Sequence, residues 1–249
     1  MEYKYTTPSW CNPYSERDME LRFMLSYLYE KSKTGPISVL DVGFAGCGYI
    51  PQILDIPNIK YTGLDGDMGR ISGRSLHMTE KDRQQWKGIL NKINYIQSDI
   101  INYQADQKYD IVMSISVIEH IIPMGYSNSN NSTDSDIRAV NSMKHLVKDD
   151  GSLVLTFPCG ITRRFISPTN KMKDELVKKG FTISRHDILI YDKDRYNQII
   201  GDWNIESKMF STYDGSKFVE TNKEKALFYY HDSSFVKSIC GLILGRNNE

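Results

Sequence analysis

Cysteine is scarce in this sequence, and the cysteines that are present lie far apart. They are Cys11, Cys47, Cys159 and Cys240, with no C-x-x-C pair among them. This spacing argues against a zinc site and suits a reducing compartment. Long apolar runs are also missing, since no stretch approaches the roughly 18 apolar residues that a membrane-spanning helix requires. The N-terminal residues have no apolar signal-peptide core, so we expect a cytoplasmic protein without a membrane span.

The sequence also lacks net charge. Lys+Arg and Asp+Glu number 31 each, so the formal net charge is zero. A nucleic-acid partner is not expected from this balance, because such proteins usually neutralise phosphates with an excess of Lys and Arg. Apolar residues make up 40% and charged residues 25%, which is typical of a globular chain. With 249 residues and no visible linker or internal repeat, the sequence predicts a single domain.

The most informative stretch joins a predicted strand to a predicted helix through a glycine-rich loop. Residues 37–42 are apolar and rich in β-branched side chains, as is typical of a buried strand. This strand contains Asp41, and Gly43, Gly46 and Gly48 follow it. Glycines let a backbone approach a ligand closely, and a helix N-terminus offers unpaired N–H groups. The loop therefore predicts a nucleotide site, with a Gly-x-x-Gly-x-Gly spacing that differs from the G-x-G-x-x-G dinucleotide pattern.

Four more predicted strands follow, over residues 60–65, 93–99, 109–115 and 151–158. Asp65 lies about twenty residues beyond the glycine loop, where a carboxylate can accept both ribose hydroxyls of a nucleotide. Asp99 ends the next strand, where it can accept from an adenine amino group. The adjacent Ile100 can pack on the adenine ring. Capping the following helix is the alternative role for each acid.

Taken in order, these segments resemble the motifs of the class I S-adenosylmethionine-dependent methyltransferases, over roughly residues 37–160. The resemblance implies an α/β fold with a Rossmann-like, doubly wound, seven-stranded sheet that is mostly parallel with one antiparallel strand. It also implies S-adenosylmethionine as the methyl donor and S-adenosylhomocysteine as the product. The residues it assigns to the donor are Asp41, Gly43, Phe44, Gly46, Gly48, Asp65, Asp99, Ile100 and Ser114. The family's loop usually reads D-x-G-x-G-x-G, and Phe44-Ala45 lengthens it here by one residue.

We expect the whole chain, residues 1–249, to form this one methyltransferase domain. Residues 1–35 are predicted to form an N-terminal arm and a helix from Glu16. Residues 36–160 are predicted to form the donor-binding core. Residues 161–249 are predicted to add substrate-side elements, with a sixth strand over 181–191, a helix over 192–200 and the antiparallel strand over 238–245.

The stretch after the fourth strand carries the candidate catalytic group. Residues 118–120, Ile-Glu-His, resemble the V-I-E-H of small-molecule O-methyltransferases, including the ubiquinone-pathway type, and of small-RNA terminal 2′-O-methyltransferases. Several members hold a divalent ion with a Glu-x-x-Glu-His cluster. Ser116 stands at the first Glu position here, so no metal site is expected. His120 is the candidate base for a hydroxyl acceptor, because it lies just beyond the strand that faces the methyl donor. Capping or packing of the turn is its alternative role.

The candidate acceptor contacts are Ser116, Tyr126, Arg163 and His231. Tyr126 begins a Ser/Asn-rich stretch, residues 125–136, that predicts a mobile loop closing over the acceptor. Arg163 follows the fifth strand. His231 lies in the C-terminal stretch and is the reserve candidate for the base.

The predicted strand, helix and aromatic stretch that follow the Pro158-Cys159-Gly160 loop resemble methyltransferases of surface-polysaccharide and other sugar biosynthesis. This resemblance implies O-methylation of a small polar acceptor, such as a sugar or glycan, and thus a role in carbohydrate modification. An RNA 2′-O-methyltransferase is one alternative, weakened by the zero net charge and by Ser116. An NAD-binding oxidoreductase is another, disfavoured by the loop spacing and by the lack of a recognisable hydride-transfer pair. A non-catalytic S-adenosylmethionine-binding module stays open, because Asp65 and Asp99 bear only on donor binding.

Overall fold

The computed structural model of the protein describes residues 6–9, 11–72, 79–121, 134–161, 188–229 and 236–247. Its strands are β1 (Ile37–Val42), β2 (Ile59–Asp65), β3 (Asn94–Gln97), β4 (Tyr109–Ile115), β5 (Val147–Pro158), β6 (Asn204–Tyr213), β7 (Phe218–Glu220) and β8 (Ser238–Gly245). Its helices are α1 (Glu16–Ser32), α2 (Ile50–Leu54), α3 (Met68–Ile71), α4 (Glu80–Leu90), α5 (Ser135–His145), α7 (Lys193–Ile200) and α8 (Lys223–Leu227), together with the 3-10 helix η1 (Ile118–His120). Among the described residues, none of the helices is both long and apolar enough to cross a membrane.

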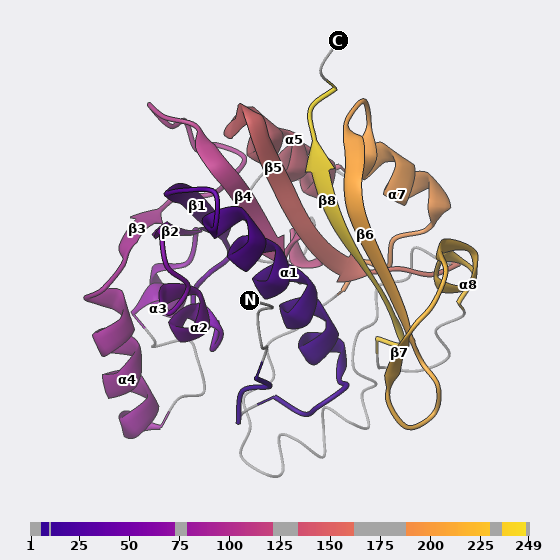
Figure 1. Ribbon diagram of the computed structural model, residues 1–249, viewed down its shortest axis with the longest axis horizontal. Coiled ribbons are helices and arrows are strands. Elements are labelled where there is room, and N and C mark those ends of the chain that lie inside the picture. The colour runs from indigo at the N-terminus through magenta and orange to yellow at the C-terminus, as the bar shows by residue number, and fades with distance from the viewer. Residues whose placement is uncertain are drawn as a thin grey trace.

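The strands within these residues form one sheet in the order β3-β2-β1-β4-β5-β8-β6-β7 (Figure 1). The five strands from β3 to β5 are parallel to one another. Strand β8 then runs antiparallel to β5, β6 antiparallel to β8, and β7 antiparallel to β6. The predicted parallel α/β core is therefore confirmed, and so is the antiparallel strand over 238–245.

The prediction of seven strands with one antiparallel member is wrong in two respects. The described sheet has eight strands, because a hairpin adds the short strand β7 beside β6, and β8, β6 and β7 each run antiparallel to the strand before them in the sheet. Of the sixth strand predicted over 181–191, residues 181–187 lie outside the described residues, and Tyr191 makes an isolated parallel bridge to Cys159. The strand after α7 is β6, whose first five residues are exposed. Because β6 has no continuous apolar run, its sequence carries little strand signal.

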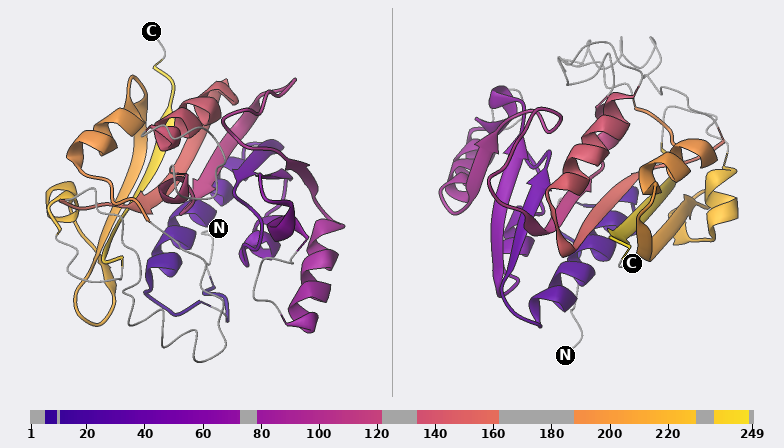
Figure 2. Two further views of the ribbon diagram at one scale, coloured as in Figure 1. Left: turned by 180° about the vertical axis from the view of Figure 1, so that it is seen from behind. Right: turned by 90° about the horizontal axis from the view of Figure 1, so that it is seen from above.

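The two faces of the sheet carry separate cores. Successive side chains of a strand point to opposite faces, so neighbouring residues of one strand join different cores. In β1, Val39 packs with α1, α2 and α4, whereas Leu40 packs with α5, α7 and α8. The views from the front and from above show α1 on one face of the sheet and α5 and α7 on the other (Figures 1 and 2). The fold is thus a three-layer α/β/α arrangement that leaves the strand ends available for a site.

Helix α1 links one core to the carboxyl edge of the sheet. Its N-cap is Ser15, whose side chain accepts a hydrogen bond from the backbone N–H of Asp18. The residues of its apolar face, predicted from their spacing, are all fully buried: Leu21, Met24, Leu25 and Leu28. The first turns of α1 reach the end of β4, where Arg17 donates to the carbonyl of Ile115 at 3.4 Å.

Candidate functional site

Two adjoining cavities lie at the carboxyl edge, where β1, β2 and β4 end. The larger has a volume of about 240 Å³ and is lined by the glycine loop, by Arg17 and by the residues that follow β4. The smaller, of about 80 Å³, is lined by the ends of β2 and β3. Gly43 and Val117 belong to both walls, so the two cavities meet there. A groove of about 750 Å³ between α1 and β6 is larger, but it has no glycine-loop residue in its wall.

The glycine loop is shaped by close packing as well as by backbone conformation. Gly43 has φ of 84°, and a Cβ placed on it would lie 2.6 Å from the side chain of Val117. Gly46 also lies in the left-handed region, with φ of 81°. Glycine is the residue that adopts such angles without strain. Gly43 reaches both cavities, whereas Gly46 and Gly48 line only the larger one.

The two predicted acids stand together in the wall of the smaller cavity, beside Ile100. Asp65 is held by backbone donors on both oxygens, from Asp67 at 2.9 Å and from Ala45 at 3.3 Å. Asp99 accepts from the backbone N–H of Ile101 at 2.9 Å. Asp99 therefore caps the local turn with this hydrogen bond and also lines the cavity.

Three residues assigned to the donor lie outside the walls of both cavities. Phe44 is fully buried, fills the space next to Gly63 and stacks on Trp86 with ring centroids 6.0 Å apart. The inserted pair Phe44-Ala45 therefore lengthens the loop in such a way that the Phe44 ring packs in the core. Ser114 is fully buried within β4. Asp41, the third, is buried on the same side as Phe44.

Asp41 is the centre of a buried hydrogen-bond cluster. Its carboxylate accepts from the hydroxyl of Tyr61 at 2.6 Å and from that of Tyr49 at 3.2 Å. Burial and, to a smaller extent, the charge of Asp65 raise the pKa of Asp41 to about 7, against the opposing effect of the two tyrosine hydroxyls. Tyr49 lines the larger cavity. Through its hydrogen bond to Tyr49, the buried Asp41 carboxylate therefore stabilises the wall of that cavity.

This cluster predicts a specific pH dependence of stability. The pKa of Asp41 is higher in the folded state than its ordinary value of 3.8, so its contribution is full below about pH 4 and is lost as the pH rises through 7. The Asp41→Asn variant cannot titrate. Between pH 5 and 7, the free energy of unfolding of the wild type should therefore fall by roughly 1 kcal/mol per pH unit relative to that of Asp41→Asn. Urea unfolding of both proteins at pH 5, 6 and 7 measures this difference, and parallel curves would contradict it.

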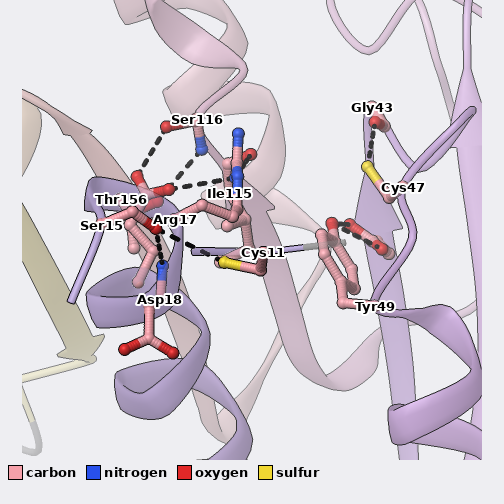
Figure 3. Close-up of polar contacts among 12 residues, drawn as sticks. Cys11, Ser15, Arg17, Asp18, Gly43, Cys47, Tyr49, Ile115, Ser116 and Thr156 are labelled. Carbon is pink, nitrogen blue, oxygen red and sulfur yellow. Dashed lines mark hydrogen bonds and ion pairs between the residues drawn. The ribbon is translucent and has the colours of Figure 1, made fainter. Parts of the chain in front are cut away.

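Ser116 is fixed in the wall of the larger cavity, opposite the glycine loop. Its φ of 51° is in the left-handed region, and its backbone N–H donates to the carbonyl and the hydroxyl of Thr156 at 3.1 and 3.0 Å. Its hydroxyl donates to Glu20 of α1 at 2.6 Å. Glu20 also pairs with Arg17 at 3.0 Å. Figure 3 shows Arg17 beside Ile115 and Ser116, with Tyr49 and Cys47 across from it.

Arg17 and Glu20 are the site residues that sequence reasoning missed. Helix α1 was predicted only as an apolar packing element, and both residues lie among its apolar positions. The available signal was a pair of opposite charges at i and i+3 near the start of that helix. Nothing in the sequence connects this pair with Ser116, which lies 96 residues from Glu20.

His120 lies in η1 and lines the larger cavity together with Arg17 and Ser116. Tyr126, Arg163 and His231 lie outside the described residues. So does the predicted loop up to residue 133, while Ser135 and Asp136 already belong to α5. Across the described ranges, no three His, Cys, Asp or Glu side chains are placed to hold a metal ion.

The whole fold is similar to that of solved methyltransferase structures. The chain is similar to the N-methyltransferase NodS from Bradyrhizobium japonicum WM9 in complex with S-adenosylhomocysteine, with a TM-score of 0.53 and 13% identity over 94% of this chain and 89% of that one. It is also similar to magnesium protoporphyrin IX methyltransferase from Synechocystis PCC 6803 with bound S-adenosylmethionine, with a TM-score of 0.51 and 15% identity over 91% and 78%. The chain has the class I S-adenosylmethionine-dependent methyltransferase fold.

The chain is also similar in sequence to curated methyltransferases, over a shorter stretch of about 102 residues. The ubiquinone biosynthesis O-methyltransferase of Rickettsia bellii (strain OSU 85-389) is 30% identical over 102 residues, which is 39% of this chain and 39% of that protein. The Rickettsia felis protein of the same name is 32% identical over 102 residues, 39% of this chain and 38% of that one. The match thus spans about two fifths of the length of these curated relatives. No protein-family model matches the chain.

Proposed function

We propose that the protein is a methyltransferase that uses S-adenosylmethionine to methylate a hydroxyl oxygen of a small polar acceptor, such as a sugar or glycan. The observation that carries this proposal is the pair of adjoining cavities at the carboxyl edge of a class I fold. Ligands of open α/β sheets bind at this edge. The relatives named as O-methyltransferases support oxygen as the acceptor atom. We place the protein in the cytoplasm because its four widely spaced cysteines suit a reducing compartment. We propose no nucleic-acid partner, because its net charge is zero.

The described residues fit the donor at both of its ends. In the smaller cavity, the two backbone donors orient the Asp65 carboxylate, whose remaining lone pairs can accept from ribose hydroxyls, and Ile100 offers an apolar surface to the adenine. In the larger cavity, Arg17 can pair with the carboxylate of the methionine moiety, since a guanidinium offers several donors to such a group. Gly43 and Val117 line both cavities, so the donor would lie along these two residues where the cavities meet. When bound, the donor supplies an activated methyl group on a sulfonium.

The residues around the larger cavity would then orient the acceptor and receive its proton. Two reactants held in the right orientation react as if one were present at an effective concentration of roughly 10⁵–10⁸ M. A hydroxyl acceptor must also lose a proton, and a ring nitrogen of His120 would take it. Ser116 is held rigidly enough to orient the acceptor, through its bonds to Thr156 and Glu20.

Asp65→Ala tests the donor-binding part of the proposal. The variant loses a charge-assisted contact to the ribose, so its affinity for S-adenosylhomocysteine should fall about tenfold to a hundredfold. Isothermal titration measures this affinity. Asp55→Ala, which removes an exposed acid at the end of α2, is the control and should bind like the wild type. Equal affinity in Asp65→Ala and the control would remove Asp65 from the donor site.

The acceptor part is tested separately by a screen. Sugars, nucleotide sugars, phenols and a short RNA are incubated with the protein and methyl-labelled S-adenosylmethionine, and label transferred to each compound is counted. Transfer to a hydroxyl compound is the expected result. Label found only in the RNA would favour the RNA methyltransferase instead.

A further inference from the structure

Another cavity, of about 470 Å³, lies between the start of α1 and the hairpin that joins β6 to β7 (Figure 1). We call it the hairpin cavity. It is at the carboxyl edge of the sheet, because β8, which begins beside it, pairs there with the last residue of β5. Ser15 and Glu16 line the hairpin cavity, and the next residue, Arg17, lines the larger cavity of the donor site. The first turn of α1 therefore separates the two cavities.

Tyr14 joins the two sides of the hairpin cavity. Its φ of 57° lies in the left-handed region, which is an outlier for an aromatic residue. Its backbone N–H donates to the buried Asp18 at 2.8 Å, and its carbonyl accepts from the N–H of Phe218 in β7 at 2.8 Å. Backbone strain of this kind persists only where surrounding contacts hold it, and it is common at ligand sites. The shape of the cavity is therefore fixed by the fold.

Two lysines line the hairpin cavity from the hairpin side, Lys217 and Lys237. The carbonyl of Lys237 accepts from the N–H of Tyr213 at 2.8 Å, and that of Lys217 accepts from the N–H of Asp214 at 3.0 Å. Both lysine backbones are thus fixed at the end of β6. The Lys217 ammonium lies 5.3 Å from the centroid of the Tyr14 ring, a contact that attracts a cation to the ring. Tyr14 therefore orients this ammonium as well.

The wall of the hairpin cavity carries more positive than negative charge at neutral pH. Glu16 is the acid in this wall. Burial, with the charge of Glu20, raises the pKa of Glu16 to about 8, so the carboxyl group is mostly uncharged there. Asp214 lies outside the wall, and its carboxylate accepts from the backbone N–H groups of Ser216 and Lys217 at 2.9 and 3.0 Å. The lysine ammonium groups therefore set the charge that a ligand meets.

We propose that the hairpin cavity binds an anionic group, a phosphate or a carboxylate, of an extended sugar acceptor whose hydroxyl is methylated at the larger cavity. This inference rests on the proposed function and narrows its acceptor to a nucleotide sugar or an acidic oligosaccharide. Ammonium groups bind such anions through charge-assisted hydrogen bonds. A helix with its side chains is about 10–12 Å across, so an acceptor that reaches past the first turn of α1 is longer than one sugar ring.

Titration of the protein saturated with S-adenosylhomocysteine tests the proposal with three extended sugars at constant ionic strength. Uridine diphosphate glucose carries a diphosphate, trigalacturonate carries carboxylates, and maltotriose is neutral. At least one of the two anionic sugars should bind about tenfold more tightly than maltotriose, the scale expected of hydrogen bonds to charged groups. The sugar that does so identifies the anion as phosphate or carboxylate. If neither anionic sugar binds more tightly than maltotriose, the proposal is overturned.

Two variants connect this preference with the hairpin cavity. Lys217→Gln and Lys237→Gln each remove one ammonium and should lower the affinity for the preferred anionic sugar about tenfold. The affinities for maltotriose and for S-adenosylhomocysteine should stay unchanged. Lys193→Gln, which removes an exposed lysine at the start of α7, is the control for charge alone. If both cavity variants bind the anionic sugar like the control, the anion does not lie in this cavity.

The two proposals fail in different ways. A wild-type protein that binds S-adenosylhomocysteine but prefers neither anionic sugar overturns only the anion site. A wild-type protein that does not bind S-adenosylhomocysteine overturns the proposed function itself.

Discussion

Replacing His120 with alanine is expected to lower kcat by at least about a hundredfold, while the affinity for S-adenosylhomocysteine changes little. General-base catalysis typically contributes about a hundredfold to ten-thousandfold. His120 lies in η1 at the wall of the larger cavity, beside Ser116 and Arg17. In the proposed reaction, it receives the proton of an acceptor hydroxyl there. The rate of methyl transfer to the acceptor found in the screen measures the effect on kcat, and isothermal titration measures the affinity.

His145→Ala is the matched control for this prediction. His145 is exposed on α5 and contacts the carbonyl of Asn141, so its loss should leave kcat unchanged. Activity should also persist in EDTA, since the proposed chemistry needs no metal ion. A His120→Ala enzyme within about threefold of the control would show that the histidine only packs the turn, because even the low end of base catalysis is about a hundredfold. Activity lost in EDTA and restored by Mg²⁺ would recast Glu119 and His120 as metal ligands.

Replacing Arg195 with methionine is expected to lower the free energy of unfolding by about 3–5 kcal/mol. Arg195 lies in the first turn of α7 and donates through two nitrogens to Asp136, in the first turn of α5. Both side chains are buried, with 6% and 2% exposed. Removing the arginine leaves the Asp136 carboxylate buried without its counter-charge. The pair also fixes the start of α5, the helix to which the chain returns after η1, so its loss should loosen the carboxyl edge.

The same arginine supplies its own control. Asp134 pairs with Arg195 at 2.9 Å, but its side chain is 62% exposed. Exposed ion pairs contribute about 0–1 kcal/mol, so Asp134→Asn should shift the free energy of unfolding by no more than that. Urea unfolding of the three proteins gives both differences. A loss below about 1 kcal/mol in Arg195→Met would show that water reaches Asp136 and that the pair is not sealed.

The parallel half of the sheet could be predicted because its strands carry local signals. Residues 37–42 and 109–115 are apolar runs bounded by turn residues, and β1 and β4 have these same bounds. Each such run is buried on both faces, so its composition differs from that of every surface segment. The position of Asp65 at the wall of the smaller cavity was predictable for the same reason, since the end of a buried strand fixes where the edge of the sheet lies.

The remaining features depend on contacts between distant parts of the chain. Strand β6 is half exposed and pairs with β8 some thirty residues later, so neither its composition nor its neighbours mark it as a strand. The turn of Phe44 into the core depends on the space beside Gly63. The position of Glu20 behind Ser116 depends on the path of α1 across the sheet. These features arise from tertiary contacts, so local propensity and periodicity in the sequence do not predict them.

Side-by-side titration of the wild-type protein with S-adenosylhomocysteine and with NAD tests the central claim most directly. Both ligands contain an adenosine, but only S-adenosylhomocysteine has the amino-acid end that the larger cavity, with Arg17 and the glycine loop, is proposed to hold. We predict saturable binding of one S-adenosylhomocysteine per chain and no measurable binding of NAD. Binding of NAD without binding of S-adenosylhomocysteine would contradict the assignment of both cavities.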